Sequence, residues 1–447
     1  MSQPAEATTA YRWVADLLTE ARARTLLLIA PLSDSDLKAQ HDPLMSPIIW
    51  DLGHIAQFEE LWLGRNLAGP VEFAEMPGMY DPFRNPRAAR AALPLPSAAE
   101  CLAAMSEARR RTLDALESLE PPADSAAGNA SALLRDGFVF RMVAQHEYQH
   151  DETILQTLQL KTGDHYRAPR AIAPPVAPVA HSAVALAEMV RFPGGEVTVG
   201  TDDRSAAYDN ERPRHAMRLA PFRIDTVPVT NGDYLAFMDA GGYADRRHWS
   251  PAGRAWLAES RAEAPKYWYR EGGEWHARSM DRCGPVVMEH PVCHVCFHEA
   301  DAYARWAGKR LPTEYEWEAA ATWDPVTGMS RAFPWGDEMP GITDANIDQL
   351  AFGTAVVGSY PRNVSPIGCH QMIGDVWEWT ASDFRPYPGY ATFPYREYSE
   401  VFFGDEYKVL RGGSWATRPG VVRTTFRNWD YPIRRQIFSG FRCARDD

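Results

Sequence analysis

Between residues 142 and 158 the chain reads Met142-Val-Ala-Gln-His146-Glu-Tyr-Gln-His150-Asp-Glu-Thr-Ile154-Leu-Gln-Thr-Leu158. Every fourth residue of this segment is apolar or a histidine. Residues four apart lie one above the other on one face of an α-helix. The pattern therefore predicts a helix whose two histidines share its buried face, where both can reach one metal ion.

Three further segments of the N-terminal part have apolar residues at helical spacing. Two of them open with helix-start signals: Ser46-Pro47 places a proline at the first helical position, and Ser97 with Glu100 makes a capping box. Four amphipathic segments of this length predict an up-and-down four-helix bundle within residues 1–167. The four predicted helices span residues 11–29, 46–67, 97–119 and 133–162.

A third histidine lies in the second predicted helix, in Trp50-Asp-Leu-Gly-His54-Ile-Ala-Gln-Phe58. It falls in the apolar stripe of that helix, and helical bundles hold metal ions with side chains from facing helices. We therefore expect His54, His146 and His150 to form one metal site. Imidazole suits iron, zinc, copper and nickel, so the residue types leave the metal open.

The same histidine pair also satisfies the H-E-x-x-H pattern of zinc proteases, in which Glu147 would act as the general base. Two features argue against a protease. The third histidine of the extended pattern is missing, because Gln156 stands at its place. In addition, a helix that turns its histidines inward is expected to turn Glu147 and Asp151 outward.

The composition of the chain changes after residue 167. Residues 168–185 are rich in alanine and proline, which predicts a semi-rigid linker. From residue 186 to 447, short apolar runs alternate with Gly, Pro, Asn and Asp, which predicts a loop-rich α+β domain. Two helices are expected there, one over residues 299–306 and one after a capping box formed by Thr313 and Glu316.

The whole chain has 447 residues, a formal net charge of −13 and six cysteines. The negative charge argues against nucleic-acid or anionic-membrane partners, both of which need a basic face. No apolar run reaches the roughly 18 residues that a membrane span needs. So few cysteines favour a reducing compartment, and we expect a soluble, cytoplasmic protein.

A second cluster of chemically active residues lies near the C-terminus, in Trp429-Asp430-Tyr-Pro-Ile-Arg434-Arg435. Adjacent charges of this kind commonly form an ion-pair patch on the surface. The same residue types also suit a zwitterionic ligand, because arginine binds a carboxylate in a fork, aspartate holds an ammonium group and tryptophan covers a cation. The residues alone leave both interpretations open.

Motifs along nearly the whole chain resemble those of a known enzyme family. Residues 53–62 and 146–150 resemble the G-H-I-x-Q-x-E-E-L-W and H-E-x-Q-H motifs of DinB-type helical bundles. The C-terminal part resembles the sulfatase-modifying, formylglycine-generating domain, which has a C-type-lectin-like fold. Five motifs in order carry that second likeness: Asp209–Pro213, Val227–Asn231, Arg310–Glu314, Gly374–Trp379 and Arg411–Trp415. Together the two parts resemble the sulfoxide synthases of ergothioneine biosynthesis, the EgtB-type hercynine oxygenases.

The resemblance departs from the formylglycine-generating enzymes at one point. Those enzymes carry a reactive cysteine pair after the G-G-S motif, whereas Thr417 and Val422 stand at the corresponding places here. The thiol-dependent copper chemistry of those enzymes is therefore not expected, and the lectin-like domain should serve another purpose.

The resemblance implies an α+β multidomain enzyme, an iron-dependent oxidoreductase with Fe(II) held by the three histidines. Dioxygen would join the thiol sulfur of γ-glutamylcysteine to C2 of the hercynine imidazole and oxidise that sulfur to a sulfoxide. The family's thiol-binding residues match Arg87, Asp430 and Arg434. Hercynine would be held by Gln149 and by the aromatic face of Trp429.

A tyrosine acts as proton donor in the family, and its segment resembles Tyr395-Arg-Glu-Tyr398-Ser-Glu-Val-Phe-Phe403. The resemblance makes Tyr395 the catalytic residue and Tyr398 a residue of the substrate pocket. Tyr387 and Tyr390 have the same three-residue spacing, so position alone does not exclude them.

Three interpretations of the function follow. The first is the γ-glutamylcysteine-dependent sulfoxide synthase, with its site formed by residues of both domains. The second is a sulfoxide synthase that uses free cysteine with hercynine or with histidine, as in ovothiol synthesis. The third, from a different class, is a non-catalytic ligand-binding protein in which the helical bundle is a scaffold. Metal content and thiol dependence separate them.

Overall fold

The computed structural model describes residues 11–67, 78–119, 129–168 and 188–447. Their contacts divide into two compact units. The first unit holds the N-terminal helices together with two segments from later in the sequence, Asp203–Tyr208 and Phe393–Arg396, and the second unit holds the other described residues from 188 onward. The linker expected at 168–185 lies outside the described residues, apart from Ala168.

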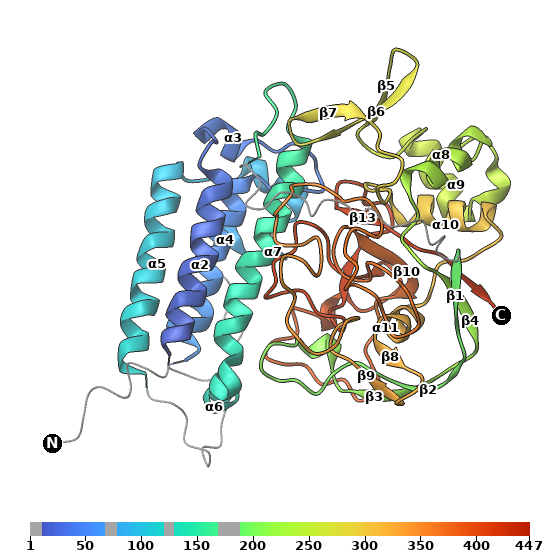
Figure 1. Cartoon of the computed structure of the whole chain (residues 1–447). Coiled ribbons are helices and arrows are strands. Elements are labelled where there is room, and N and C mark those ends of the chain that lie inside the picture. The colour runs from blue at the N-terminus through green and yellow to red at the C-terminus, as the bar shows by residue number, and fades with distance from the viewer. Residues whose placement is uncertain (1–10, 68–77, 120–128, 169–187) are drawn as a thin grey trace. The chain divides into compact units, whose positions relative to one another are not determined.

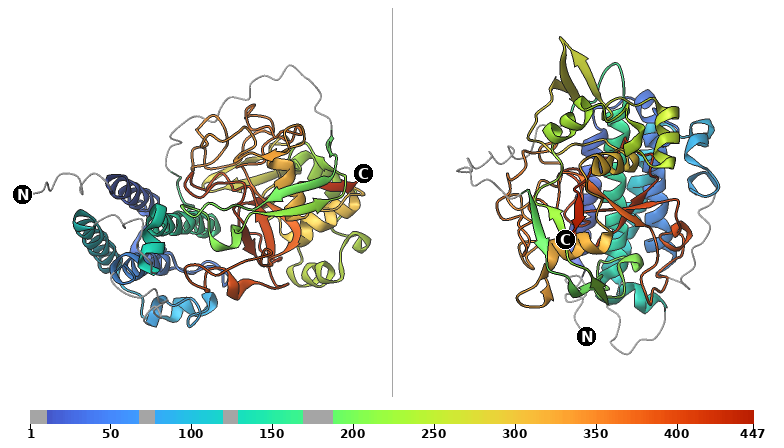
Figure 2. Two further views of the ribbon diagram at one scale, coloured as in Figure 1. Left: turned by 90° about the horizontal axis from the view of Figure 1, so that it is seen from below. Right: turned by 90° about the vertical axis from the view of Figure 1, so that its right-hand side faces the viewer.

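Four long helices make up the body of the first unit, and they lie side by side in Figure 1. The left view of Figure 2 looks along their axes. Helix α2 packs on α7, and α4 packs on both α5 and α7. This arrangement confirms the predicted four-helix bundle. The α-helices of the unit are α2 Arg12–Ile29, α3 Asp34–Lys38, α4 Ile48–Glu59, α5 Ala98–Ser118, α6 Asn129–Leu134 and α7 Phe138–Leu160.

The start of α5 is as predicted, whereas the start of α4 is not. The Ser97 hydroxyl accepts a hydrogen bond from the Glu100 amide at 3.3 Å, and the Glu100 carboxylate accepts one from the Ser97 amide at 2.8 Å. Helix α4 begins at Ile48 without a side-chain cap. Pro47, not Ser46, stands at the N-cap position, and the Ser46 hydroxyl accepts a hydrogen bond of 2.6 Å from Arg90.

The fourth predicted helix is two helices, which corrects the prediction of one segment from 133 to 162. Helix α6 ends at Leu134, and a short 3-10 turn separates it from α7. Within that turn Asp136 and Gly137 have φ of 56° and 71°. A helix cannot pass through two consecutive left-handed residues, so α7 begins anew at Phe138.

The second unit is a loop-rich α+β domain, as predicted. Its largest sheet has the order β12-β11-β10-β13, in which only β10 and β13 run parallel. In a three-stranded sheet, β1-β4-β14, the first and the last strand of the unit both pair with β4, and all three lie beside the C-terminus in Figure 1. Helix α11 covers the core of the unit, where its Trp317 packs with Phe192 and Phe222.

The two helices expected in this domain are present, as α10 and α11. The Thr313 hydroxyl and the Glu316 carboxylate form the predicted capping box of α11. The helices of the unit are α8 Asn231–Asp239, α9 Pro251–Ser260, α10 Phe297–Trp306 and α11 Glu314–Thr322. The strands are β1 Met189–Phe192, β2 Gly195–Val199, β3 His215–Leu219, β4 Phe222–Asp225, β5 Trp268–Glu271, β6 Glu274–Ser279, β7 Arg282–Pro285, β8 Trp323–Asp324, β9 Met329–Ser330, β10 Trp377–Asp383, β11 Lys408–Arg411, β12 Asn428–Asp430, β13 Ser439–Gly440 and β14 Ala444–Asp446.

Among the described residues, no helix has both the length and the apolar character that a membrane-spanning helix requires.

Candidate metal centre

Three imidazoles converge between α4 and α7. His54 comes from α4, and His146 and His150 come from successive turns of α7. The Nε2 atoms of His54 and His146 are 3.2 Å apart, and one nitrogen from each of the three rings lies within 4.8 Å of the others. Three nitrogen donors at this spacing can bind one ion of a metal that accepts imidazole.

Polar groups lie behind two of the rings, and a hydrogen bond holds that of His54 in an orientation suited to a metal. The Nδ1 atom of His54 lies 3.0 Å from the main-chain carbonyl oxygen of Tyr80, which can only accept a hydrogen bond. Nδ1 therefore carries the proton, and Nε2 keeps its lone pair for a metal. Nδ1 of His150 lies 3.3 Å from a carboxylate oxygen of Asp51. Carboxylates and carbonyls behind histidine ligands are the usual means of fixing the ring and its tautomer.

Aromatic rings stack on two of the three imidazoles. The Trp50 ring stacks on His54 with centroids 4.9 Å apart, and the Phe58 ring stacks on His146 at 3.7 Å. Burial lowers the pKa of His54 and of His146, and the neighbouring His150 lowers both further. Neutral imidazole is the form that binds metals, so the surroundings favour the ligand state.

Glu147 and Asp151 are buried inside the bundle, so the prediction that they point outward is wrong. Glu147 accepts hydrogen bonds from Arg22 Nε at 2.7 Å and from Arg109 Nη2 at 2.9 Å. Asp151 accepts one from the Thr25 hydroxyl at 2.8 Å. The arginines offset the cost of burying a carboxylate, which explains why the bundle interior contains this face of α7. The two histidines of α7 are half-buried instead.

The same contacts bear on the zinc-protease interpretation of H-E-x-x-H. A general base must reach the proton that it removes. Both carboxylate oxygens of Glu147 are occupied by arginine donors, and only 1% of its surface is exposed. The structure therefore leaves Glu147 without the access that a protease base needs.

Gly53 lets the Tyr80 side chain pack closely against α4, and the main-chain carbonyl of Tyr80 orients His54. A β-carbon at this position would lie 2.1–2.3 Å from ring carbons and the hydroxyl oxygen of Tyr80, which packs against α4 there. We expect Gly53→Ala to displace the Tyr80 segment, at a cost of about 1–3 kcal/mol in folding free energy. Because the Tyr80 carbonyl orients the His54 ring, affinity for a divalent metal should fall by about 10-fold or more. Anaerobic metal titration and thermal unfolding would measure the two effects.

Gly64→Ala is the matched control for that prediction. The nearest atoms to its β-carbon, at 3.0 Å, belong to the end of the Glu60 side chain, which can move away. The Gly64 variant should keep both its stability and its metal affinity. Equal metal affinity in the Gly53 variant and the parent would contradict the role given to Tyr80.

Tyr395, the tyrosine expected to donate a proton, belongs to the first unit through its contacts. Its ring lies 5.0 Å from the Trp62 ring and 6.2 Å from the Phe58 ring, and Phe58 in turn stacks on His146. Tyr395 is buried, with 8% of its surface exposed. In the same unit, the side-chain amide of Gln149 donates to the Tyr208 hydroxyl at 2.8 Å.

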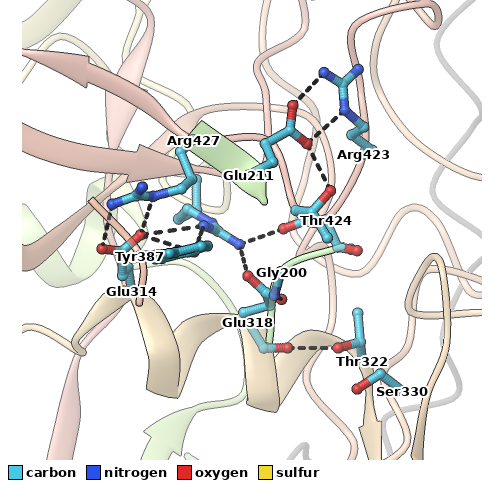
Figure 3. A network of polar contacts seen from close by, with 12 residues as sticks. Gly200, Glu211, Glu314, Glu318, Thr322, Ser330, Tyr387, Arg423, Thr424 and Arg427 are labelled. Carbon is cyan, nitrogen blue, oxygen red and sulfur yellow. Dashed lines mark hydrogen bonds and ion pairs between the residues drawn. The ribbon is translucent and has the colours of Figure 1, made fainter. Parts of the chain in front are cut away.

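The two other tyrosines left open by the sequence have hydroxyls that are engaged within the second unit. Tyr387 lies in the buried network of Figure 3, where its hydroxyl is 3.4 Å from Glu314 and the Arg427 guanidinium lies 4.1 Å over its ring. The Tyr390 hydroxyl donates to Asp209 at 2.8 Å. Both hydroxyls thus contact carboxylates of the second unit.

The residues expected to bind substrate in the second unit form one group. Trp429 and Asp430 lie on β12, and Arg434 is buried with its Nε 3.5 Å from a carboxylate oxygen of Asp430. The Tyr398 ring stands perpendicular to Trp429 at 5.7 Å, and Phe384 stacks on Trp429 at 4.2 Å. Aromatic rings, a carboxylate and a guanidinium are thus brought together by the fold.

Arg87 and Arg90 lie in a 3-10 turn of the first unit and differ in exposure. Arg87 is exposed. The Arg90 guanidinium is buried 3.4 Å over the Trp50 ring, on the indole that also stacks on His54. Burial lowers the pKa of Arg90 to about 10, which leaves the side chain charged at neutral pH.

Sequence reasoning missed two residues behind the histidines. Asp51 stands three positions before His54 on α4, so helical spacing offered a signal for it. No sequence signal pointed to Tyr80, because it contributes a main-chain carbonyl at the end of a short 3-10 helix. Any residue type could supply that carbonyl.

Two family models match the chain. The DinB superfamily model matches residues 17–154. The model of the sulfatase-modifying factor enzyme 1-like domain matches residues 176–447. These matches confirm the expected pairing of a DinB-like helical bundle with a C-terminal domain of C-type-lectin-like fold.

Similar proteins include relatives that match almost end to end. The hercynine oxygenase of Mycobacterium tuberculosis is 46% identical over 435 residues, which cover 96% of this chain and 97% of the relative. The hercynine oxygenase of Mycolicibacterium smegmatis is 45% identical over 448 residues, covering 97% and 98%. The formylglycine-generating enzyme of Streptomyces coelicolor is 38% identical over 290 residues, but these cover only 58% of this chain and 88% of the relative.

Proposed function

The chain belongs to the hercynine oxygenase family, and on that premise we propose that it is a non-haem iron(II) sulfoxide synthase of ergothioneine biosynthesis. Its substrates would be hercynine, γ-glutamylcysteine and dioxygen. The observation that carries the proposal is the convergence of three imidazole nitrogens within 4.8 Å in a chain 46% identical to a hercynine oxygenase over 96% of its length.

The donor set fits iron. His54, His146 and His150 would hold Fe(II) through three neutral imidazoles and would leave coordination positions for substrates, which suits a catalytic rather than a closed structural site. The His54 tautomer, fixed by the Tyr80 carbonyl, supports this assignment. Bound Fe(II) would supply the activation of dioxygen and would favour the thiolate form of a bound thiol.

The proposed reaction balances without an external reductant. Forming the carbon–sulfur bond removes one hydrogen from the thiol and one from C2 of the imidazole. Oxidising the sulfur then adds one oxygen atom. Dioxygen accepts four electrons in total, delivering one atom to sulfur and the other to water. The protein must therefore position two organic substrates and manage protons.

We assign substrate binding in the second unit to Trp429, Asp430 and Arg434. Hercynine carries a trimethylammonium group that has no hydrogen to donate, so an aromatic face is its fitting partner. The rings of Tyr398 and Phe384 around Trp429 support that role. The Asp430 carboxylate and Arg434 guanidinium match the ammonium and carboxylate groups of γ-glutamylcysteine.

In the first unit, Arg87 and Gln149 complete the proposed binding residues. Arg87 is exposed and can pair with a second carboxylate of the thiol substrate. Gln149 lies between the two histidines of α7 in sequence, on the half-buried side of that helix, and would serve the imidazole side of hercynine. Its hydrogen bond to Tyr208 orients the amide.

Tyr395 is the proposed catalytic residue. Its position beside Phe58, whose ring stacks on His146, supports the role. The phenol would hold a proton at Oη and transfer it to the oxygen that is being reduced. The buried aromatic contacts of Trp62 and Phe58 restrict the ring and exclude water from it.

An oxygen-electrode assay with a set of thiols tests the proposed function. We expect iron-loaded protein to consume dioxygen rapidly only when hercynine and γ-glutamylcysteine are both present, because Arg87, Asp430 and Arg434 match the extra charges of that thiol. Equal efficiency with free cysteine would remove the reason for assigning these three residues. Turnover of cysteine with histidine would favour an ovothiol-type synthase, and absence of turnover with any pair would favour a binding protein.

A further inference from the structure

The interior of the bundle contains a closed ring of four charged side chains, one from each long helix. Arg22 of α2 and Arg109 of α5 alternate with Glu59 of α4 and Glu147 of α7. We call these four residues the charge ring. Its four sides measure 3.0 Å from Arg22 to Glu59, 2.7 Å from Arg22 to Glu147, 2.8 Å from Arg109 to Glu59 and 2.9 Å from Arg109 to Glu147.

The charge ring is buried and its formal charges cancel. The side chains of its arginines are 8–9% exposed and those of its glutamates 1%. Both oxygens of each carboxylate accept hydrogen bonds from arginine. Arg22 also donates to the Met105 carbonyl at 2.8 Å, and Arg109 to the Leu18 carbonyl. Every member is therefore held in one geometry.

Stability alone does not explain such a ring. A buried ion-pair network of this kind is often no more stabilising than apolar side chains of the same volume, because desolvation offsets the Coulombic attraction. Contacts between apolar side chains, unlike hydrogen bonds, are not directional. Hydrogen-bonded forks fix the relative position of two helices, whereas an apolar contact tolerates sliding.

The two carboxylates of the ring sit on the two helices that carry the histidines. Glu147 directly follows His146 on α7, and Glu59 lies five residues after His54 on α4. Each arginine bridges both carboxylates, so the ring ties α4 to α7. A slip of one residue along a helix moves a side chain by about 1.5 Å. A metal site tolerates errors of only about 0.2 Å in ligand distance.

We propose that the charge ring sets the register of α4 against α7 and so holds the three imidazoles at metal-binding spacing before a metal arrives. Arg22, Glu59, Arg109 and Glu147 are then positioning residues that touch neither metal nor substrate. This inference rests on the proposed function, because it assumes that the three histidines bind a metal.

The test replaces the ring by apolar side chains of similar volume, in the variant Arg22→Met, Glu59→Leu, Arg109→Met and Glu147→Leu. We expect the metal-free variant to unfold at a temperature equal to or above that of the parent. Its Fe(II) affinity, measured anaerobically by chelator competition, should fall by about 10- to 100-fold. The visible spectrum of the Co(II)-loaded variant should differ from that of the parent, because the ligand geometry changes.

The matched control removes an ion pair of α5 outside the ring. Arg110 pairs with Glu107 at 2.7 Å on the exposed face of the helix. The variant Arg110→Met with Glu107→Leu should keep the parent's Fe(II) affinity and Co(II) spectrum. A control that loses affinity to the same extent as the ring variant would overturn the proposal.

A second variant keeps the test decisive if the protein with four apolar replacements does not fold. Arg109→Lys retains the charge but loses the fork between Glu59 and Glu147. We expect it to fold and to bind Fe(II) several-fold more weakly than the parent, with an altered Co(II) spectrum. Unchanged affinity and spectrum in a folded ring variant would overturn the inference. Failure of the parent itself to bind Fe(II) would instead overturn the proposed function, and the inference with it.

Discussion

Replacing His146 by alanine is expected to abolish tight Fe(II) binding and, with it, sulfoxide formation. His146 supplies one of three nitrogens, and its Nε2 lies 3.2 Å from that of His54. Loss of a group behind a ligand costs about 10- to 100-fold in metal affinity, and loss of a ligand itself should cost more. Only two imidazole ligands would remain to hold the ion.

Anaerobic titration with Fe(II) measures this effect, and we expect about one ion per chain in the parent, as a single three-histidine site implies. His165→Ala is the control, because this histidine belongs to the same unit, lies outside the three-histidine group and has its Nδ1 3.1 Å from the Lys161 carbonyl. The control should bind as the parent does. Retention of the metal by the His146 variant would rule out the three-histidine site.

Tyr395→Phe is expected to lower sulfoxide formation by about 100-fold or more while leaving the metal in place. General acid catalysis contributes roughly 10²- to 10⁴-fold, and phenylalanine removes only the hydroxyl that would carry the proton. The ring contacts with Trp62 and Phe58 are kept, so the fold and the histidines should be undisturbed. Dioxygen consumption should shift toward oxidation of the thiol alone.

The product ratio of sulfoxide to oxidised thiol, together with the iron content, measures this outcome. Tyr390→Phe is the informative comparison, because the sequence left that tyrosine open and its hydroxyl is bonded to Asp209. The Tyr390 variant should keep the parent's ratio. A ratio unchanged in the Tyr395 variant but altered in the Tyr390 variant would move the proton-donor role to Tyr390.

Local signals in the sequence were sufficient to predict where a helix begins when a capping box marks its first turn. The capping boxes at Ser97 and Thr313 predicted the starts of α5 and α11, since a cap depends only on residues within one turn. The pair Asp136-Gly137 is a turn signal that could have located the break before α7. The predicted cap at Ser46 was wrong because Pro47 is the N-cap residue, and the Ser46 hydroxyl bonds to Arg90, a contact that no local pattern reveals.

The histidine spacing predicted which residues meet, but not which side of α7 faces the bundle interior. That side is set by Arg22 and Arg109, which come from other helices and make burial of Glu147 tolerable. A pattern based on apolar periodicity assumes that charged residues face outward. Here the polar partners are contributed across the bundle, so only the three-dimensional structure could identify the buried side.

In the second unit, the sequence predicted the fold class and the cluster around Trp429 but not the pairing of the strands. The strands are two to seven residues long, and sheet order such as β12-β11-β10-β13 depends on contacts far apart in the chain. The stacking of Phe384 on Trp429 is of the same kind. Residue type predicted that Trp429 could cover a cation, and the fold shows which rings surround it.

The measurement that tests the proposed function most directly is the mass of the product formed from hercynine and γ-glutamylcysteine by iron-loaded protein under isotopically labelled dioxygen. The proposed function predicts one coupled product, joined through sulfur at C2 of the imidazole and carrying a single labelled oxygen atom on sulfur. Consumption of dioxygen with only disulfide or oxidised thiol as product, or a coupled product without the label, would contradict it.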